Sequence, residues 1–290
     1  MTLTVGQLIE HVAGGFAQAE LFYGHGTDNP HDEAAALVFH VLELAHTGGA
    51  DLYERVVTPE QNERVTLLSA QRIETRKPLA YLLQEAWFAG VSFCVDERVL
   101  IPRSPLAELI ADRFEPWIHP EQIKSILEVG TGSGCIAVAC ALEFPAVAVT
   151  ATDISSDALD VARLNVDRYK LADRVKLIEA DLLSGVEGAF DIIISNPPYV
   201  PDQERAELPS EYAFEPALGL FSGTDGLDSA RRILQDAPRL LSPDGILVLE
   251  VGAQWQALEQ AFPALPFTWL EFEYGGEGVA VLRAGDLQQH

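Results

Sequence analysis

The chain has 290 residues, 48% of them hydrophobic and 22% charged, which is ordinary for a globular protein with one large domain and a smaller one. Its 19 basic and 44 acidic residues give a formal net charge of −25, so most of its surface would repel a phosphate backbone. It has no apolar run long enough to cross a bilayer, no signal pattern, and three cysteines without disulfide-framework or metal-ligand spacing. We therefore expect a cytoplasmic protein that binds neither DNA nor membranes directly, holds no metal and favours a basic protein as its partner.

Residues 1–85 have the apolar spacing of a small helical bundle. Apolar side chains recur at helical intervals over residues 5–16 and again over residues 36–44. A third helix is expected after Thr58, because Thr58-Pro59-Glu60-Gln61 combines an N-cap, a proline at the first helical position and a capping-box glutamine. This third helix would carry Val65, Leu68 and Ile73 on its apolar face.

Residues 86–103 alternate between apolar and polar side chains, which predicts a β-hairpin linker with Asp96 and Glu97 near its tip. Ser104 followed by Pro105 then marks the start of a helix. Arg103, at this junction, could form a structural ion pair or could face a ligand. The sequence does not decide between the two.

Residues 104–290 are predicted to form an α/β domain. From residue 124 onward, apolar strand patterns at 125–129, 147–152, 175–179, 190–195 and 246–251 alternate with helical patterns at 136–142, 158–169 and 228–241. Two late strands are expected at 267–272 and 279–283. The alternation of strand and helix predicts a parallel sheet with crossover helices, the Rossmann-like arrangement.

A glycine-rich turn joins the first of these strands to its helix. Gly130, Gly132 and Gly134 allow a tight turn and a close approach of a ligand to the backbone. Their spacing differs from the dinucleotide pattern Gly-x-Gly-x-x-Gly, which disfavours a nicotinamide or flavin cofactor. Packing alone is the other interpretation of such a turn.

Two acidic residues follow the next two strands. Asp153 stands where a carboxylate accepts hydrogen bonds from ribose hydroxyls, although it could instead cap the following helix. Asp181, after the third strand, is placed to meet an adenine amino group, or it is simply a loop acid. Because the carboxyl ends of parallel strands share one edge of a sheet, the turn and the two acids together predict a nucleoside pocket.

The strand at 190–195 ends abruptly in Asn196-Pro197-Pro198-Tyr199. Proline donates no hydrogen bond to a sheet and holds the preceding residue in extended geometry, so the Asn196 and Pro197 carbonyls are available as acceptors. A planar NH2 group would fit between these acceptors and the ring of Tyr199. For a lone Asn-Pro, a rigid turn would be the better interpretation, but the complete motif after a buried strand is far more specific. We find no Ser-His-Asp or Cys-His constellation for covalent catalysis.

Together these motifs resemble the S-adenosylmethionine-dependent amino methyltransferases. Within that class the chain is similar, over nearly its whole length, to the HemK/PrmC group of protein-glutamine methyltransferases. The further matching segments are Arg76-Lys77-Pro78-Leu79-Ala80-Tyr81-Leu82, Phe93 with Val99-Leu100-Ile101-Pro102-Arg103, Glu215-Pro216-Ala217-Leu218 and Gly223-Thr224-Asp225-Gly226-Leu227. Arg103-Ser104-Pro105 and residues 267–272 resemble the branch that modifies the third protein of the large ribosomal subunit rather than the release-factor branch.

The resemblance implies methyl transfer from S-adenosylmethionine to a glutamine side-chain nitrogen in a protein of the translation machinery. It implies that the helical domain recognises the partner, and that Asn196, Pro197 and Tyr199 act in catalysis, with Pro198 beside them at the substrate. The implied cofactor-binding residues are Glu128, Gly130, Thr131, Gly132, Gly134, Asp153, Asp181 and Asn196. Phe93 and Arg103 are further possible site residues. Leu182 stands where the release-factor enzymes often carry an adenine-stacking tryptophan.

Three alternatives remain. A release factor could be the substrate, through the same chemistry. A nucleic-acid adenine methyltransferase would share the Asn-Pro-Pro-Tyr motif, but residues 201–216 contain five acids and only Arg205 as a base, which is the wrong charge for a DNA-facing lip. A catalytically inactive cofactor-binding scaffold would leave the motif at Asn196 unexplained.

Overall fold

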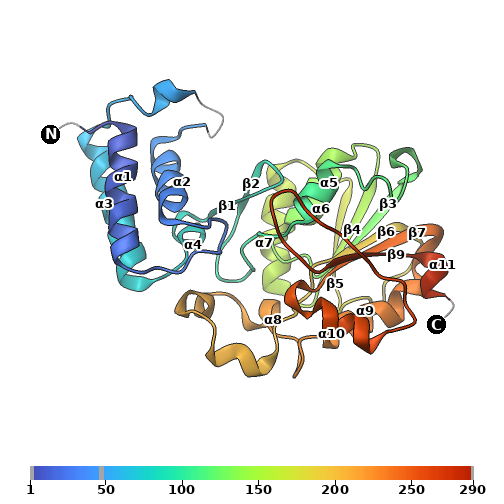
Figure 1. Ribbon diagram of the computed structural model, residues 1–290. Helices are drawn as coiled ribbons and strands as arrows, with labels where there is room; N and C mark the ends of the chain where they lie inside the picture. The colour runs from blue at the N-terminus through green and yellow to red at the C-terminus, as the bar shows by residue number, and fades with distance from the viewer. Residues whose placement is uncertain (1–2, 46–48, 289–290) are drawn as a thin grey trace. The chain divides into compact units, whose positions relative to one another are not determined.

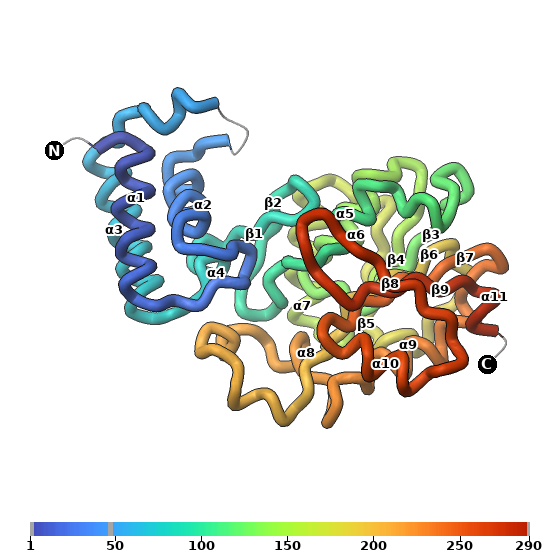
Figure 2. The backbone as a smooth tube through the Cα atoms, viewed as in Figure 1, coloured from blue at the N-terminus to red at the C-terminus, as the bar shows by residue number. Residues whose placement is uncertain are grey.

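The computed structural model describes residues 3–45 and 49–288 (Figures 1 and 2). The chain folds as two compact units. One is Met1–Ala86 together with Pro209–Phe214, and the other is Trp87–Leu208 together with Glu215–His290. Within the described part of the chain, no helix combines the length and the apolar character needed to cross a membrane.

The first unit is helical, as predicted. It contains α1 (Val5–Gln18), α2 (Pro30–Leu42), the 3-10 turn η1 (Ala50–Leu52), α3 (Pro59–Thr75) and α4 (Leu79–Leu83). The expected capping box is present, since the Thr58 side chain accepts from the Gln61 N–H and the Gln61 side chain accepts from the Thr58 N–H. Apolar residues from α1, α2 and α3, such as Leu8, Leu37 and Val65, form one core.

Helix α3 buries an arginine, Arg72, next to the partly exposed Ile73. Ile73 is 37% exposed, whereas Arg72 is fully buried and its Nε lies 2.6 Å from a carboxylate oxygen of Glu33. The other guanidinium nitrogens of Arg72 donate to the carbonyls of Phe22 and Arg76. Apolar spacing could not reveal this arginine, because its burial depends on acceptors from Glu33, Phe22 and Arg76 that only the folded unit brings together.

The segment Pro209–Phe214, which contains η4 (Ser210–Phe214), packs within the first unit. Its Glu211 is completely buried, accepts the Phe22 N–H at 3.0 Å and lies 2.7 Å from a guanidinium nitrogen of Arg76. The ring of the adjacent Tyr212 packs 4.7 Å from the ring of His25, centroid to centroid. Glu211 is therefore an internal anchor and not a surface acid.

The predicted hairpin is formed by β1 (Glu85–Phe88) and β2 (Val91–Cys94). Its tip is Ala89-Gly90, where both residues have positive φ angles, 48° and 77°. Asp96 and Glu97 follow β2 and are not at the tip. The predicted tip was wrong because alanine rarely adopts the left-handed conformation, so Ala89 carries no turn signal in the sequence.

The second unit contains a seven-stranded sheet in the order β5-β4-β3-β6-β7-β9-β8. Five strands are parallel: β3 (Ser125–Val129), β4 (Ala148–Asp153), β5 (Val175–Glu179), β6 (Phe190–Ser195) and β7 (Leu241–Glu250). At one edge, β9 (Val279–Arg283) is antiparallel to β7, and β8 (Thr268–Trp269) is antiparallel to β9. The α/β prediction is confirmed, and the bounds of four strands match the expected ones.

Helices cover both faces of this sheet (Figure 1). One apolar core joins the strands to α5 (Leu106–Ala111), α6 (Cys135–Glu143) and α7 (Ser156–Arg168). The other joins them to α9 (Asp228–Asp236), α10 (Trp255–Ala261) and α11 (Ala284–Leu287). In β6, Ile192 and Ile194 enter the first core and Ile193 the second, as the alternation of side chains along a strand requires. The remaining short elements are η2 (Pro120–Gln122), η3 (Asp202–Ala206), α8 (Ala217–Leu220), η5 (Ala237–Arg239) and η6 (Gly252–Gln254).

The register of the sheet determines which residues meet at its carboxyl edge. Val129 at the end of β3 lies between Thr152 of β4 and Ser195 of β6. Ser195 in turn pairs with Leu249 of β7. The residues that come after these positions (Gly130, Asp153, Asn196 and Glu250) therefore emerge at the same level of neighbouring strands.

Candidate methyltransferase site

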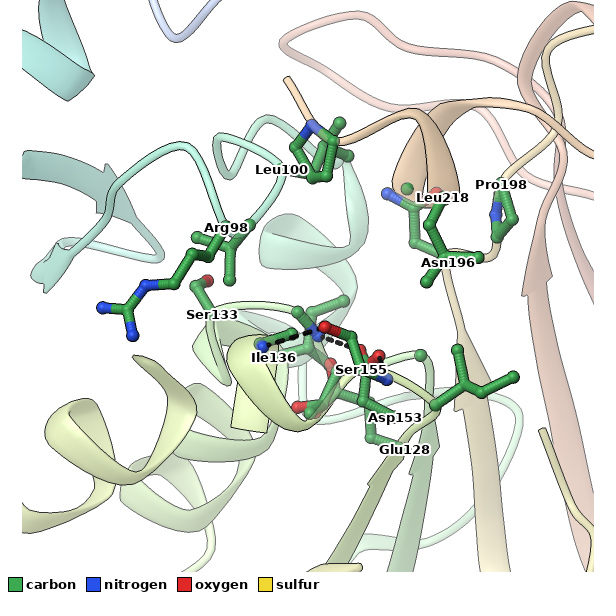
Figure 3. Close-up of a pocket in the computed structure, with 18 of the residues that line it drawn as sticks. Arg98, Leu100, Glu128, Ser133, Ile136, Asp153, Ser155, Asn196, Pro198 and Leu218 are labelled. Atoms are coloured by element: carbon green, nitrogen blue, oxygen red, sulfur yellow. Dashed lines mark hydrogen bonds between the residues drawn. The ribbon is translucent and has the colours of Figure 1, made fainter. Parts of the chain in front are cut away.

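A cavity of about 560 Å³ lies at this carboxyl edge (Figure 3). It is bounded by the loop after β3, the acid that ends β4, the acid after β5, the turn after β6, residues of α8 and α9, and the segment between β2 and α5. All of these elements belong to the second unit. Of the predicted site residues, those that line it are Glu128, Gly130, Thr131, Gly132, Asp153, Asp181, Asn196, Pro198 and Arg103.

The three glycines of the turn have different roles. Gly130 and Gly132 line the cavity with φ angles of 75° and 54°, and a Cβ atom at either would meet no atom within 4 Å, so it would point into open space. A Cβ at Gly134 would lie 3.1 Å from the Cβ of Ala162 in α7. Gly134 is not part of the lining. It lets α6 pack closely on α7, and its predicted contact with a cofactor stays a prediction.

Glu128 brings a buried carboxyl group to the cavity. One oxygen, Oε2, accepts hydrogen bonds from the Thr131 hydroxyl at 2.6 Å and the Ala137 N–H at 2.9 Å. The other, Oε1, is buried without a hydrogen-bond partner among the described residues. Burial raises the pKa of Glu128 to about 8. A buried acceptor without a donor is costly, so this oxygen is suited to a cationic donor bound in the cavity.

Asp153 uses its carboxylate to hold the glycine turn. It accepts the Gly132 N–H at 2.8 Å and the Ser155 N–H at 2.9 Å, and it lines the cavity. The helix cap of α7 is Ser155, whose hydroxyl accepts from the Ala158 N–H. The alternative interpretation of Asp153 as the helix cap is therefore excluded. Burial raises the pKa of Asp153.

Asp181 has a partner that the sequence did not reveal. Its carboxylate lies 2.8 Å from a guanidinium nitrogen of Arg232 in α9, and this hydrogen bond lowers the pKa of Asp181. Both residues line the cavity, together with Ile154 and Leu182. Arg232 was missed because it is 51 residues away along the chain and no local pattern distinguishes it from an ordinary surface arginine.

Only two of the four residues of the Asn-Pro-Pro-Tyr turn line the cavity. Asn196 and Pro198 line it, whereas Pro197 is buried and Tyr199 is outside the lining. The Tyr199 ring packs on Gly252, where a Cβ would lie 2.7 Å from the ring carbon Cε2. The Tyr199 side chain was expected to face a bound amide. In the structure the ring contacts the backbone of Gly252, and its packing against a bound amide stays a prediction.

Behind the turn lies a second buried acid, Glu250, at the end of β7. The Ser104 hydroxyl donates a hydrogen bond to it, and the Tyr199 hydroxyl interacts with the same carboxyl group. Burial raises the pKa of Glu250 to about 7. An acid at the end of a central strand is the same signal that identified Asp153, so Glu250 could have been found from the sequence.

For Arg103 the sequence left two possibilities, a structural ion pair or a side chain that faces a ligand. The structure shows the ion pair. The Arg103 guanidinium lies 2.5 and 2.8 Å from the two oxygens of Glu215, which also accepts the Ile101 N–H at 3.0 Å. Arg103 lines the cavity as well. Phe93 does not, since its side chain is completely buried in the core against the ring of Tyr169.

These contacts weaken the charge argument made for residues 201–216. Glu211 and Glu215 are both buried and paired with arginines, so they add nothing to a charged lip. Among the five acids of the segment, Asp202, Glu204 and Glu207 retain contact with solvent. The surface of the segment is therefore less acidic than its composition suggests.

Comparison with known proteins gives the family. Residues 108–214 match the family described as "Methyltransferase small domain". A ribosomal protein uL3 glutamine methyltransferase of Neisseria meningitidis serogroup B is 44% identical over 96% of this chain and 92% of its own length. A protein of the same name from Francisella tularensis is 43% identical over 93% of this chain and 87% of its own length. The chain belongs to the family of these uL3 glutamine methyltransferases.

The methyltransferase fold also recurs in a solved structure. The catalytic domain of hMettl16, in complex with a hairpin of the MAT2A 3′UTR, superposes with a TM-score of 0.53 at 17% identity. The match covers 78% of this chain and 82% of that one. This likeness concerns the fold. The family assignment rests on the uL3 glutamine methyltransferases.

Proposed function

We propose that this protein transfers a methyl group from S-adenosylmethionine to the side-chain amide nitrogen of a glutamine in ribosomal protein uL3. One observation carries the proposal: a single cavity joins the acids Glu128 and Asp153 to the amide of Asn196. The names of the relatives, which match over nearly the whole chain, support the ribosomal substrate.

The residues at the acidic end suit this cofactor. The unpartnered Oε1 of Glu128 would accept from the amino group of its methionine part, and Asp153 would accept from the ribose hydroxyls. Asp181 would meet the adenine, with Ile154 and Leu182 as apolar neighbours in place of an aromatic side chain. When bound, S-adenosylmethionine supplies an electrophilic methyl group on a sulfonium.

At the other end, Asn196 would orient the target amide. An amide nitrogen is a poor nucleophile because its lone pair is delocalised into the carbonyl. We propose that the Asn196 side chain and the Pro197 carbonyl accept hydrogen bonds from the NH2 group and hold the nitrogen towards the methyl donor. Such positioning contributes up to about 7–11 kcal/mol to lowering a barrier. No base is needed if the proton leaves to water after transfer, and Tyr199 would act by holding the turn.

The net charge of the chain supports a proposal about its protein partner. A chain with a net charge of −25 attracts basic proteins and repels phosphate backbones, so we propose a basic ribosomal protein as partner, without direct DNA binding. We propose that the helical first unit recognises this partner and that the reaction takes place in the cytoplasm.

Transfer of tritium from methyl-labelled S-adenosylmethionine tests this function. Purified uL3, a release factor and adenine-containing DNA would be assayed side by side, with Asn196→Ala as the inactive control. We expect label on uL3, at one glutamine identified by mass spectrometry. Label on the release factor alone would show that the substrate is a release factor and not uL3. Label on DNA alone, or on none of the three, would refute the proposal.

A further inference from the structure

Leu218 is an exposed apolar side chain at the mouth of the cavity. It is 56% exposed and lies on the short helix α8. Among the large apolar side chains of the described residues that are exposed, only Leu218 and Ile154 also line the cavity. Ile154 comes directly after Asp153 at the acidic end. Leu218 lies at the opposite end, beside Asn196 and Pro198 (Figure 3).

The helix that carries Leu218 is held in place from three directions. Val200, directly after the Asn-Pro-Pro-Tyr turn, donates its N–H to the Leu220 carbonyl and accepts from the Ser222 N–H. At the other end of α8, Glu215 pairs with Arg103. In the middle, Gly219 packs on Leu100, since a Cβ at Gly219 would lie 3.7 Å from the Cβ of Leu100.

These contacts attach α8 to the turn that carries Asn196. Leu218 is therefore presented at a set position relative to the Asn196 amide, although its own side chain remains largely in solvent. Single exposed leucines are common and need no explanation. Leu218 differs from these because α8 holds it at the rim of a ligand cavity. Its exposed side chain adds little to the stability of the fold, and a bound ligand could bury it.

Apolar neighbours extend this surface. Pro198 lies beside Leu218 in the lining (Figure 3), and Leu100 and Pro216, which also line the cavity, both contact the neighbouring Gly219. A glutamine side chain that brings its amide to Asn196 must pass two methylene groups through this apolar region. Glu128 and Asp153 lie at the cofactor end, and the charge of Arg103 near α8 is neutralised by its ion pair with Glu215, so the contact open to the methylenes is the apolar one.

We propose that Leu218 is a substrate-specificity residue that packs, with Leu100, against the methylene groups of the target glutamine and the adjoining peptide backbone. The inference rests on the proposed function and adds a residue to its substrate site. Packing on a side chain of this length favours glutamine over asparagine, whose amide is one methylene shorter. A difference of one methylene is worth about 10- to 200-fold in such a pocket.

The test compares Leu218→Ala with Leu142→Ala. Leu142 is a matched control because it is an exposed leucine, 38% accessible, on α6 of the same unit and outside the lining. We expect Leu218→Ala to raise the KM for uL3 about 10-fold, as for the loss of a buried leucine contact. The dissociation constant for S-adenosylmethionine and the unfolding midpoint should stay at wild-type values. Leu218→Met should restore most of the activity, and Leu142→Ala should match the wild type.

Two results would overturn the inference: a KM for uL3 within twofold of the wild type in Leu218→Ala, or a parallel loss of cofactor affinity. A binding measurement, which does not depend on methyl transfer, tests the role of Leu218 separately from the proposed function. Calorimetry with a short glutamine-containing peptide, in the presence of S-adenosylhomocysteine, should show weaker binding to Leu218→Ala than to the wild type. If the wild type binds the peptide in this way but methylates no uL3, only the proposed function fails. Equal peptide binding by both proteins refutes the role of Leu218.

Discussion

Asn196 and Asp153 lie in one cavity but should fail in different ways when replaced. We expect Asn196→Ala to lower kcat about 100- to 1000-fold, because an amide-orienting acceptor is lost, while cofactor affinity stays within an order of magnitude. Asp153→Ala should instead weaken cofactor binding about 10- to 100-fold through the lost charged hydrogen bonds. Turnover kinetics and calorimetry distinguish the two. Unchanged cofactor affinity in Asp153→Ala would exclude the ribose role.

Glu128 should release a proton when a cationic ligand binds. Burial raises its pKa to about 8 in the free protein, so at pH 7 it is mostly protonated. An ammonium group beside Oε1 favours the carboxylate and lowers this pKa, so the proton leaves on binding. S-adenosylhomocysteine is a suitable ligand because its amino group is already protonated at neutral pH.

The measurement is the binding enthalpy at pH 7 in buffers of different ionisation enthalpy. The slope should correspond to nearly one proton released, should decline as the pH rises past about 8, and should vanish in Glu128→Gln. A wild-type slope of zero at pH 7 would show that Glu128 does not meet the amino group.

Tyr199 and Glu250 should act as a coupled pair behind the turn. Tyr199→Phe removes only the hydroxyl, and Glu250→Gln replaces the carboxyl group by a neutral amide of the same shape. If the pair positions the turn, each should lower kcat about 10- to 100-fold, a cost typical of a small misplacement of reacting groups. The double variant should be little worse than the poorer single one. Multiplicative losses in kcat would mean that the two side chains act independently.

At the scale of elements, η4 should be an anchor of the helical unit. Burial raises the pKa of Glu211, but hydrogen bonds from Phe22 and Ser210 and the charge of Arg76 outweigh it, so the pKa is lowered. Glu211→Gln leaves Arg76 without its paired carboxylate, whereas the buried Arg72, 3.8 Å from Glu211, keeps its ion pair with Glu33. We expect a loss of about 2–3 kcal/mol in the free energy of unfolding, less than for a fully buried pair because Arg76 is 35% exposed.

Chemical denaturation followed by circular dichroism measures this loss, with the exposed Glu207→Gln as control. Because the folded pKa of Glu211 lies below its usual 4.5, its contribution is present above that pH and is lost as the pH falls through the folded value. Equal stability of the two variants would show that the segment is not anchored by this carboxylate.

At the scale of the whole molecule, the net charge of −25 should make stability depend on salt. Like charges repel in the compact state, and the Debye length falls from about 10 Å at 0.1 M to about 3 Å at 1 M ionic strength. We expect the unfolding midpoint to rise between low and high sodium chloride. A midpoint that falls would show that the attractive ion pairs outweigh the repulsion. An uncharged osmolyte at equal osmolarity serves as the control.

The sequence by itself determined the strands and the residues at their carboxyl ends. A buried parallel strand is a short run of β-branched and apolar residues, and the residue after its last position must lie at the shared edge of the sheet. For that reason the strands at 125–129 and 190–195, the glycine turn, Asp153 and Asn196 were all predictable from local pattern.

Only the tertiary structure decided which side chains find partners far along the chain. Glu211 pairs with Arg76 and Glu215 with Arg103, the second pair across 112 positions, and the Tyr199 ring turns to Gly252. Such choices depend on which surfaces the packed elements bring within reach of one another. The spacing of residues in the sequence does not determine which distant segments meet in the fold. The orientation of Tyr199 and the contacts that hold the helix of Leu218 could therefore be found only in the tertiary structure.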